Sequence, residues 1–183
     1  MLGHGAGGAA GAQTSDLLAV AGVAGRCGWA VALVDQPWVV AGRRVAVAPP
    51  RLDVAWLAVV EHLRHHAEAF ADGVPLVLGG RSAGARVACR TASQLGADGV
   101  LCLAFPLVTP RGVSRADELP TSSPTLVAQG ERDRFADPDA VRRAASPDVE
   151  VVALRTDHSL RQDHDVLTQA VGSWLDRLAQ RRP

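Results

Sequence analysis

The chain lacks any excess of charge. Lysine is absent, and nineteen arginines balance nineteen acidic residues over 183 positions. Because the net charge is zero, we expect neither nucleic acid nor an anionic membrane surface as a partner. No uninterrupted apolar run approaches the length of a membrane span, and no basic, apolar leader opens the sequence. We therefore expect a soluble, cytoplasmic protein, with its oligomeric state left open.

Patterns that bind metals or form disulfide frameworks are also missing. The three cysteines are far apart and form no C-x-x-C pair, which argues against a zinc site and against a disulfide framework. H-E-x-x-H is absent as well. Three histidines share i, i+3 and i+4 spacing on a predicted helix, and we interpret them as an exposed helix face. They are His62, His65 and His66. We expect no metal and no cofactor.

Short apolar segments alternate with longer amphipathic ones, which is typical of βα units and a mainly parallel sheet. Continuous hydrophobicity suits strands that are buried on both faces. The predicted strands are Trp29–Asp35, Val74–Gly79, Gly99–Phe105, Pro124–Gly130 and Val149–Arg155. The predicted helices are Thr14–Cys27, Leu52–Ala71, Ala83–Leu95, Pro138–Ala145 and His164–Gln180. The sequence therefore predicts one doubly wound α/β domain over residues 1–183.

The segment LVLGGRSAGARVA, Leu76–Ala88, places a serine between a predicted strand and a predicted helix. Its residues Gly80 to Gly84 fit G-x-S-x-G, the pattern of a nucleophile elbow. A serine on so tight a turn needs small residues two positions before and after it. The N-terminus of the following helix favours negative charge nearby. Ser82 is therefore either a nucleophile or an ordinary helix cap.

A nucleophilic serine needs a base, and the base needs an orienting carboxylate. Asp133 follows the predicted strand that ends at Gly130, and His158 follows the next predicted strand. All three side chains thus come from the carboxyl ends of parallel strands, where ligands bind in such sheets. Their order along the chain is also that of an α/β-hydrolase. We predict that Ser82, Asp133 and His158 act together.

A tetrahedral oxyanion would need two backbone N–H donors. We predict Ala83, directly after the serine, and Ala6 in the glycine-rich segment GHGAGG. His4 in that segment is interpreted as orienting the loop and not as the base. The other competing residues are assigned to helix capping or to the surface, namely Asp137, Asp139 and His164. Two arginines beside the serine, Arg81 and Arg86, would either attract an anionic substrate or bind neighbouring parts of the protein.

Five segments together resemble the small α/β-hydrolase family related to dienelactone hydrolases: HGAGG, GGRSAGARVA, LCLAFPL, VAQGERDRF and TDHSL. That family includes the hydrolase-like subunit of the NSL histone acetyltransferase complex and many uncharacterised bacterial members. The resemblance runs over nearly the whole chain. It implies a triad of Ser82, His158 and Asp133, with Ala83 and Ala6 as oxyanion donors. Ala83 stands where the family more often has methionine, which keeps the backbone donor and removes bulk from the pocket floor.

The start of the chain departs from the family pattern. The family has a full strand before the HGAGG segment, whereas here only Met1 and Leu2 precede Gly3. We expect either that the true start lies upstream or that the sheet has lost strands on this side. A missing central strand would leave neighbouring backbone groups unpaired.

The loop after Phe105, where larger hydrolases insert a lid, is short, so the sequence predicts an open site without a lid domain. The predicted function is a serine hydrolase that cleaves an ester or related acyl bond of a small-molecule substrate through an acyl-enzyme. One alternative is acyl transfer to an acceptor other than water, which would use the same triad. Another is a catalytically silent binding protein or scaffold. The three retained residues favour the enzyme, and the shortened start favours the scaffold.

Overall fold

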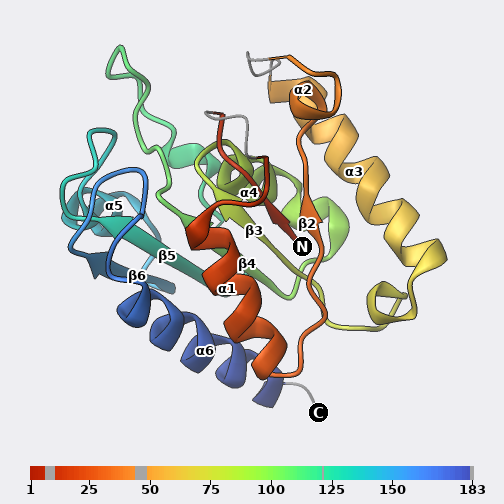
Figure 1. The fold of residues 1–183 in the computed structure, drawn as a ribbon. Coiled ribbons are helices and arrows are strands. Elements are labelled where there is room, and N and C mark those ends of the chain that lie inside the picture. Colours follow the sequence, from red (N-terminus) through yellow and green to blue (C-terminus); the bar gives the residue numbers. More distant parts are fainter. Residues whose placement is uncertain (7–10, 44–48, 121, 182–183) are drawn as a thin grey trace.

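The computed structural model describes residues 1–6, 11–43, 49–120 and 122–181. A six-stranded parallel sheet with the order β2-β1-β3-β4-β5-β6 forms the centre of the molecule (Figure 1). The strands are β1 (Leu2–Gly3), β2 (Leu33–Val34), β3 (Val77–Arg81), β4 (Gly99–Leu103), β5 (Thr125–Gly130) and β6 (Val149–Leu154). The strand order reverses at β1, because the chain moves from β1 out to β2 and returns to β3 on the other side. Such a reversal is where doubly wound sheets place their ligand sites.

Helices cover both faces of this sheet (Figure 1). The described helices are α1 (Ser15–Arg26), α2 (Pro37–Val40), α3 (Pro49–His66), α4 (Ala83–Leu95), α5 (Pro138–Ala144) and α6 (His164–Gln180), with 3-10 turns at Glu68–Phe70 and Ala116–Glu118. Leu17 of α1 and Leu167 of α6 are buried in the core on one face. Trp56 of α3, Val87 of α4 and Val141 of α5 are buried in the core on the other. The predicted doubly wound, parallel α/β architecture is confirmed.

The structure corrects several predicted boundaries. Strand β2 is confined to Leu33–Val34, within the predicted Trp29–Asp35, because its neighbour β1 offers only two residues to pair with. Helix α3 begins at Pro49 and ends at His66, and the predicted continuation to residue 71 is a 3-10 turn instead. Strand β1 and helix α2 were not predicted, because two and four residues carry too little periodicity.

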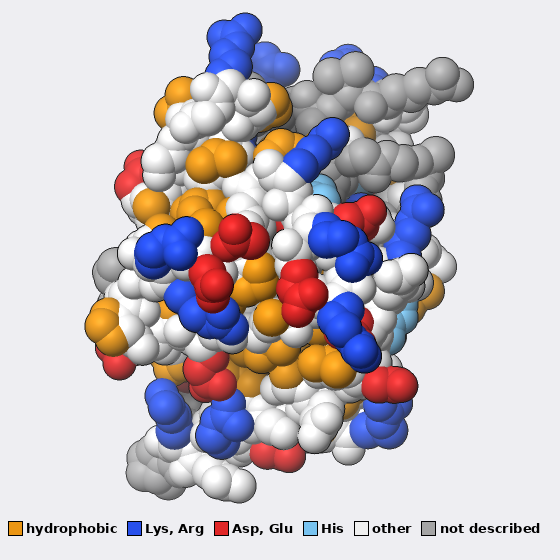
Figure 2. Space-filling model, turned by 90° about the vertical axis from the view of Figure 1, so that its left-hand side faces the viewer, with side chains coloured by type: hydrophobic (Ala, Val, Ile, Leu, Met, Phe, Trp, Pro, Cys, Tyr) orange, Lys and Arg blue, Asp and Glu red, His pale blue; other side chains and the backbone are white. Residues whose placement is uncertain are grey.

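Charged side chains of both signs are mixed over the surface. The face that contains α5 and β6 in Figure 1 shows arginines and acidic residues interspersed, without a patch of one sign (Figure 2). This agrees with the even charge balance of the sequence. In the part of the chain that the structure describes, no helix has the length and hydrophobicity needed to cross a bilayer.

Candidate active site

The turn between β3 and α4 presents Ser82 in an uncommon backbone conformation. Ser82 has φ 53° and ψ −106°, a region that residues with a side chain rarely adopt. Its N–H donates a hydrogen bond of 2.9 Å to the carbonyl oxygen of Leu103 at the end of β4. A Cβ atom on Gly80 or on Gly84 would lie 2.2 Å from the carbonyl oxygen of Gly3. Only glycine at these two positions lets the turn approach β1, which is the crowding that the G-x-S-x-G pattern predicted.

The side chain of Ser82 does not cap α4. The residue stands at the N-cap position, yet its hydroxyl makes no capping hydrogen bond. Its Oγ instead lies 3.0 Å from Nε2 of His158. The sequence left open whether Ser82 is a nucleophile or a helix cap. In the structure its hydroxyl faces a possible base and not the N–H groups of the helix.

His158 bridges Ser82 and Asp133. Its Nδ1 lies 2.7 Å from Oδ2 of Asp133, whose side chain is completely buried. Because an ionised carboxylate only accepts hydrogen bonds, the proton of the neutral ring sits on Nδ1. The unprotonated Nε2 then faces the Ser82 hydroxyl, which donates to it. The structure therefore brings together the three side chains that the sequence places after three different strands.

Gln129 supports Asp133 and was missed in the sequence. This completely buried residue of β5 donates through Nε2 to Asp133 Oδ2 at 2.9 Å and to the carbonyl oxygen of Ala136 at 2.9 Å. The other carboxylate oxygen, Oδ1, accepts from the N–H of Phe135 at 2.9 Å. These hydrogen bonds hold both oxygens of the Asp133 carboxylate in place. The available signal was a polar side chain inside an otherwise apolar predicted strand.

Aromatic packing holds the imidazole from the side. The Phe135 ring meets the His158 ring edge to face, with ring centroids 4.6 Å apart. The Arg134 guanidinium lies 4.7 Å from the centroid of the Phe135 ring. The side chain of His158 remains 22% exposed, so the imidazole is reachable from solvent. Phe135 was also missed, because its position two residues after Asp133 carries no pattern of its own.

The loop that follows β1 passes beside the serine. A Cβ atom on Gly5 would lie 3.4 Å from Cβ of Ser82 and 3.3 Å from Nη2 of Arg81. His4 is buried and donates from Nδ1 to the carbonyl oxygen of Gly5 at 2.8 Å, while Nε2 accepts from the N–H of Gln36 at 2.9 Å. Desolvation lowers the pKa of His4, which keeps the ring neutral. Ala6 follows in an exposed bend, and residues 7–10 of the glycine-rich segment lie outside the described residues.

The two arginines near Ser82 bind different neighbours. Nε of Arg81 lies 3.5 Å from Oδ2 of Asp16, a buried carboxylate at the start of α1. Arg86 points away to the loop after β4, where its Nε donates to Glu118 Oε2 at 2.7 Å. Arg81 thus borders the site, whereas Arg86 joins α4 to that loop.

The residues that competed with the three site residues occupy other places. Asp137 caps α5 by accepting from the N–H of Ala140 at 2.7 Å, as predicted. Asp139 is exposed, with 73% of its side chain accessible. His164 bonds to the carbonyl oxygen of Leu160 at 2.7 Å. The three neighbouring histidines of α3 are exposed, as predicted: His62, His65 and His66. Over the described ranges, no group of three potential ligand side chains is placed to hold a metal ion.

Comparison with known proteins places this geometry in context. A family model described as an alpha/beta hydrolase domain matches residues 1–179. A sequence search of the curated proteins finds no match. Among solved structures, a Xanthomonas campestris protein described as an α/β serine hydrolase without a lid shares 23% identity and a TM-score of 0.75, covering 93% of this chain and 77% of its own.

Two further solved structures are similar over most of their length. A Pyrococcus furiosus esterase shares 16% identity and a TM-score of 0.71, covering 96% of this chain and 81% of its own. A Butyrivibrio proteoclasticus protein solved with ferulic acid bound shares 13% identity and a TM-score of 0.71, covering 98% and 88%. These likenesses confirm the predicted fold, which is of the α/β-hydrolase type.

Proposed function

This chain belongs to the alpha/beta hydrolase family, and on that premise we propose that it is a serine hydrolase that cleaves ester or related acyl bonds through an acyl-enzyme. The observation that carries the proposal is the chain of contacts from Ser82 Oγ to His158 Nε2 at 3.0 Å and from His158 Nδ1 to Asp133 Oδ2 at 2.7 Å. This is the arrangement that a neutral hydroxyl needs in order to become a nucleophile.

The reaction follows from these contacts in two halves. Ser82 Oγ attacks the acyl carbon while its proton passes to Nε2 of His158, and the Asp133 carboxylate stabilises the resulting imidazolium. Collapse of the tetrahedral intermediate breaks the bond to the leaving group, which takes the proton from His158. Water then gives a proton to His158 and attacks the acyl carbon. Collapse of this second tetrahedral intermediate breaks the bond between the acyl carbon and Ser82 Oγ, which takes the proton back from His158 as the acid leaves.

The oxyanion in both halves would be bound by the N–H groups of Ala83 and Ala6. Ala83 is the first residue of α4, so its N–H points out of the helix N-terminus beside Ser82. For Ala6, the support comes from His4, which fixes the Gly5 carbonyl oxygen on its own side. In a trans peptide the next N–H points the opposite way, so Ala6 N–H is directed away from His4. Gly5 itself lies against Ser82.

The substrate that suits this site is small or presented on a surface. His158 is partly exposed, and the described residues from Val108 to Pro120 form a loop with one short 3-10 turn and no lid domain. We therefore propose a short soluble ester or an acyl group carried on a protein. The finer resemblance to the dienelactone-hydrolase branch of the family stays a prediction.

A fluorophosphonate probe tests the proposal, because it labels only an activated serine. We expect labelling at Ser82, mapped by peptide mass analysis, together with hydrolysis of p-nitrophenyl acetate. Ser82→Ala and His158→Ala should abolish labelling, and Asp133→Asn should lower kcat/KM by about 10³-fold or more. Ser93→Ala, on the exposed end of the same helix, is the matched control and should retain full activity. A folded protein without labelling would instead support the scaffold alternative.

A further inference from the structure

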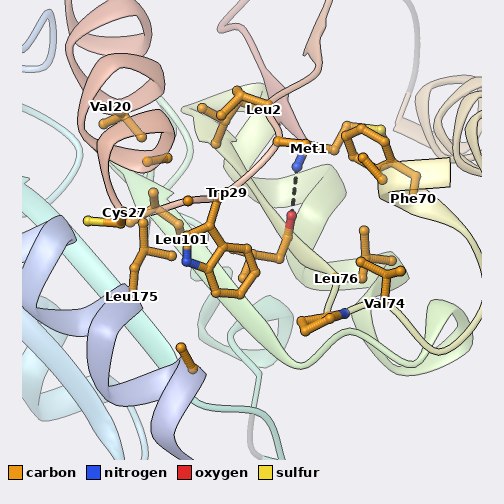
Figure 3. Close-up of a pocket in the computed structure, with 18 residues that line it drawn as sticks. Met1, Leu2, Val20, Cys27, Trp29, Phe70, Val74, Leu76, Leu101 and Leu175 are labelled. Carbon is orange, nitrogen blue, oxygen red and sulfur yellow. Dashed lines mark hydrogen bonds between the residues drawn. The ribbon is translucent and has the colours of Figure 1, made fainter. Parts of the chain in front are cut away.

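Buried polar atoms without hydrogen-bond partners gather between the start of α1 and the end of β3. Within the described part of the chain, these atoms are Oγ1 of Thr14, both carboxylate oxygens of Asp16 and Nε of Arg81. By contrast, the apolar pocket at the amino ends of the strands, which Val20 and Leu175 help to line, contains no such side-chain atom among the described residues (Figure 3). A buried charge is costly unless it is paired, so Asp16 and Arg81 depend on each other.

Asp16 is the charge partner that holds the Arg81 guanidinium. Nε of Arg81 lies 3.5 Å from Oδ2 of Asp16. The Asp16 side chain is 1% exposed and that of Arg81 is 13% exposed, so salt screens this pair only weakly. Asp16 also lies in the first turn of α1, where the helix favours a carboxylate. The sequence left open whether Arg81 attracts an anionic substrate or binds the protein itself, and the structure shows a contact of the second kind.

The Arg81 guanidinium lies against Gly5, in the segment that follows β1. A Cβ atom on Gly5 would lie 3.3 Å from Nη2 and 3.5 Å from Nε of Arg81, and 3.4 Å from Cβ of Ser82. The same side of Gly5 therefore faces the arginine and the proposed nucleophile. Because Arg81 directly precedes Ser82 in the chain, its side chain links the peptide between Gly5 and Ala6 to the turn that presents the hydroxyl.

Two hydrogen bonds hold the same segment, and neither involves the turn after β3. His4 Nδ1 donates to the Gly5 carbonyl oxygen at 2.8 Å. Farther along the chain, the N–H of Ala12 donates to Asp35 Oδ1 at 2.8 Å. These hydrogen bonds fix the direction of the Gly5 carbonyl and the far end of the segment. Within the described residues, Arg81 is therefore the charged side chain that ties Gly5 to the turn.

We propose that Asp16 and Arg81 are positioning residues of the oxyanion site: Asp16 holds the guanidinium against Gly5, and this contact keeps the Ala6 N–H beside Ser82. The role rests on the proposed hydrolase function. In it neither side chain touches the reacting atoms, and both act through the position of the N–H donor. A displacement of about 1 Å in such a group lowers a rate by about 10²-fold, because the donor binds the charge that develops in the transition state.

Steady-state hydrolysis of p-nitrophenyl acetate tests this role in Arg81→Gln. We expect kcat to fall at least about tenfold while KM stays within about twofold, because the oxyanion forms only in the transition state. Trifluoroacetophenone, which forms a tetrahedral oxyanion adduct with an activated serine, should bind more weakly by the same factor as the loss in kcat/KM. A kcat equal to that of the wild type, or an unchanged affinity for this inhibitor, would overturn the proposal.

Arg86→Gln is the matched control. Arg86 pairs with Glu118 and its side chain is 17% exposed, close to the 13% of Arg81, but it is not one of the nearest neighbours of Gly5. The variant therefore loses an ion pair of similar burial and should keep the wild-type kcat and inhibitor affinity. Equal losses in Arg86→Gln and Arg81→Gln would indicate a general effect of lost ion pairs and would contradict the role of Arg81.

A double variant separates positioning from stability. Arg81→Gln alone leaves the buried Asp16 charge unpaired and should lower the Tm. Asp16→Asn combined with Arg81→Gln removes both charges and should regain most of the lost Tm, while kcat stays at least about tenfold below that of the wild type. Recovery of both the Tm and kcat would show that Arg81 only neutralises Asp16, and would overturn the proposal.

Failure of this role is distinguishable from failure of the hydrolase function. A wild-type protein that neither hydrolyses the ester nor is labelled at Ser82 by the fluorophosphonate probe would overturn both. An active wild type whose kcat and inhibitor affinity are unaffected by Arg81→Gln would overturn the positioning role alone.

Discussion

The backbone of Ser82 has φ 53°, and this conformation turns the hydroxyl away from the helix that it would otherwise cap. Such a conformation costs on the order of 1–3 kcal/mol and persists only where neighbours enforce it. Here the N–H of Ser82 is tied to Leu103, and glycines on both sides allow contact with Gly3. The neighbours therefore hold the hydroxyl toward His158 instead of toward the N–H groups of α4.

His4 makes the stability of the fold depend on pH. Its folded-state pKa is lowered, chiefly by desolvation, from an unfolded value of 6.5. Below pH 6.5 the unfolded chain therefore binds a proton that the folded protein does not, so the free energy of unfolding falls as pH falls toward the lowered pKa. The slope for one group reaches about 1.4 kcal/mol per pH unit. Above pH 6.5 His4 is mostly neutral in both states, so it takes nothing from the free energy of unfolding there.

Urea unfolding between pH 5 and pH 8 measures this effect in the wild type and in His4→Gln. The variant lacks the titrating ring, so its free energy of unfolding should fall less steeply below pH 6.5. Groups other than His4 are common to both proteins, so their contributions cancel in the difference. Identical slopes for the two proteins would rule out a contribution from His4.

At the scale of elements, the approach of α4 and β3 to β1 depends on glycine. A Cβ atom on Gly84 would lie 2.2 Å from the Gly3 carbonyl oxygen, whereas one on Gly25 of α1 would have no neighbour within 4 Å. Gly84→Ala should lower the free energy of unfolding by about 1–3 kcal/mol and reduce probe labelling at Ser82. Gly25→Ala should raise it by about 0.5–1 kcal/mol, since it removes glycine from an exposed helical position. Thermal unfolding compares the two, and equal effects would contradict the described packing.

Helix α5 begins at an N-cap residue that was predicted from the sequence. Asp137 accepts from the N–H of Ala140, and a proline follows at the first helical position. Asp137→Ala should lower the free energy of unfolding by about 1 kcal/mol. Asp139→Ala, two residues on, removes only an exposed pair with Arg142 and should change it by less than about 0.5 kcal/mol. Chemical denaturation of both variants distinguishes them, and a larger loss for Asp139→Ala would refute the capping assignment.

At the scale of the molecule, one sheet separates two cores, and each contains tryptophan. Trp38 and Trp56 are buried on the α3 and α4 face, while Trp174 is buried on the α1 and α6 face. Because both cores share the strands of the same sheet, we expect them to unfold together as one domain. Far-UV circular dichroism and tryptophan fluorescence should give one midpoint in urea, also in Trp174→Phe, which reports mainly from the other face. Two separated transitions would show independent units.

How far the sequence predicted the site differs from residue to residue. Ser82, Asp133 and His158 were selected because each follows a recognisable strand, and the carboxyl ends of parallel strands meet at one edge. Gln129 was missed because its contact to Asp133 depends on how the loop after β5 turns back. Phe135 was missed for the same reason, since ring packing against His158 leaves no trace in local spacing.

The sequence by itself determined the alternation of strands and helices, the cap at Asp137, and the tight turn around Ser82. These are properties of hydrophobic periodicity and of backbone conformations that neighbouring residues dictate. Only the tertiary structure decided the shortening of β2 and the contact of the buried Asp16 with Arg81. Each of these depends on which segments, far apart in the sequence, become neighbours in space. The spacing of residues along the chain does not contain that information.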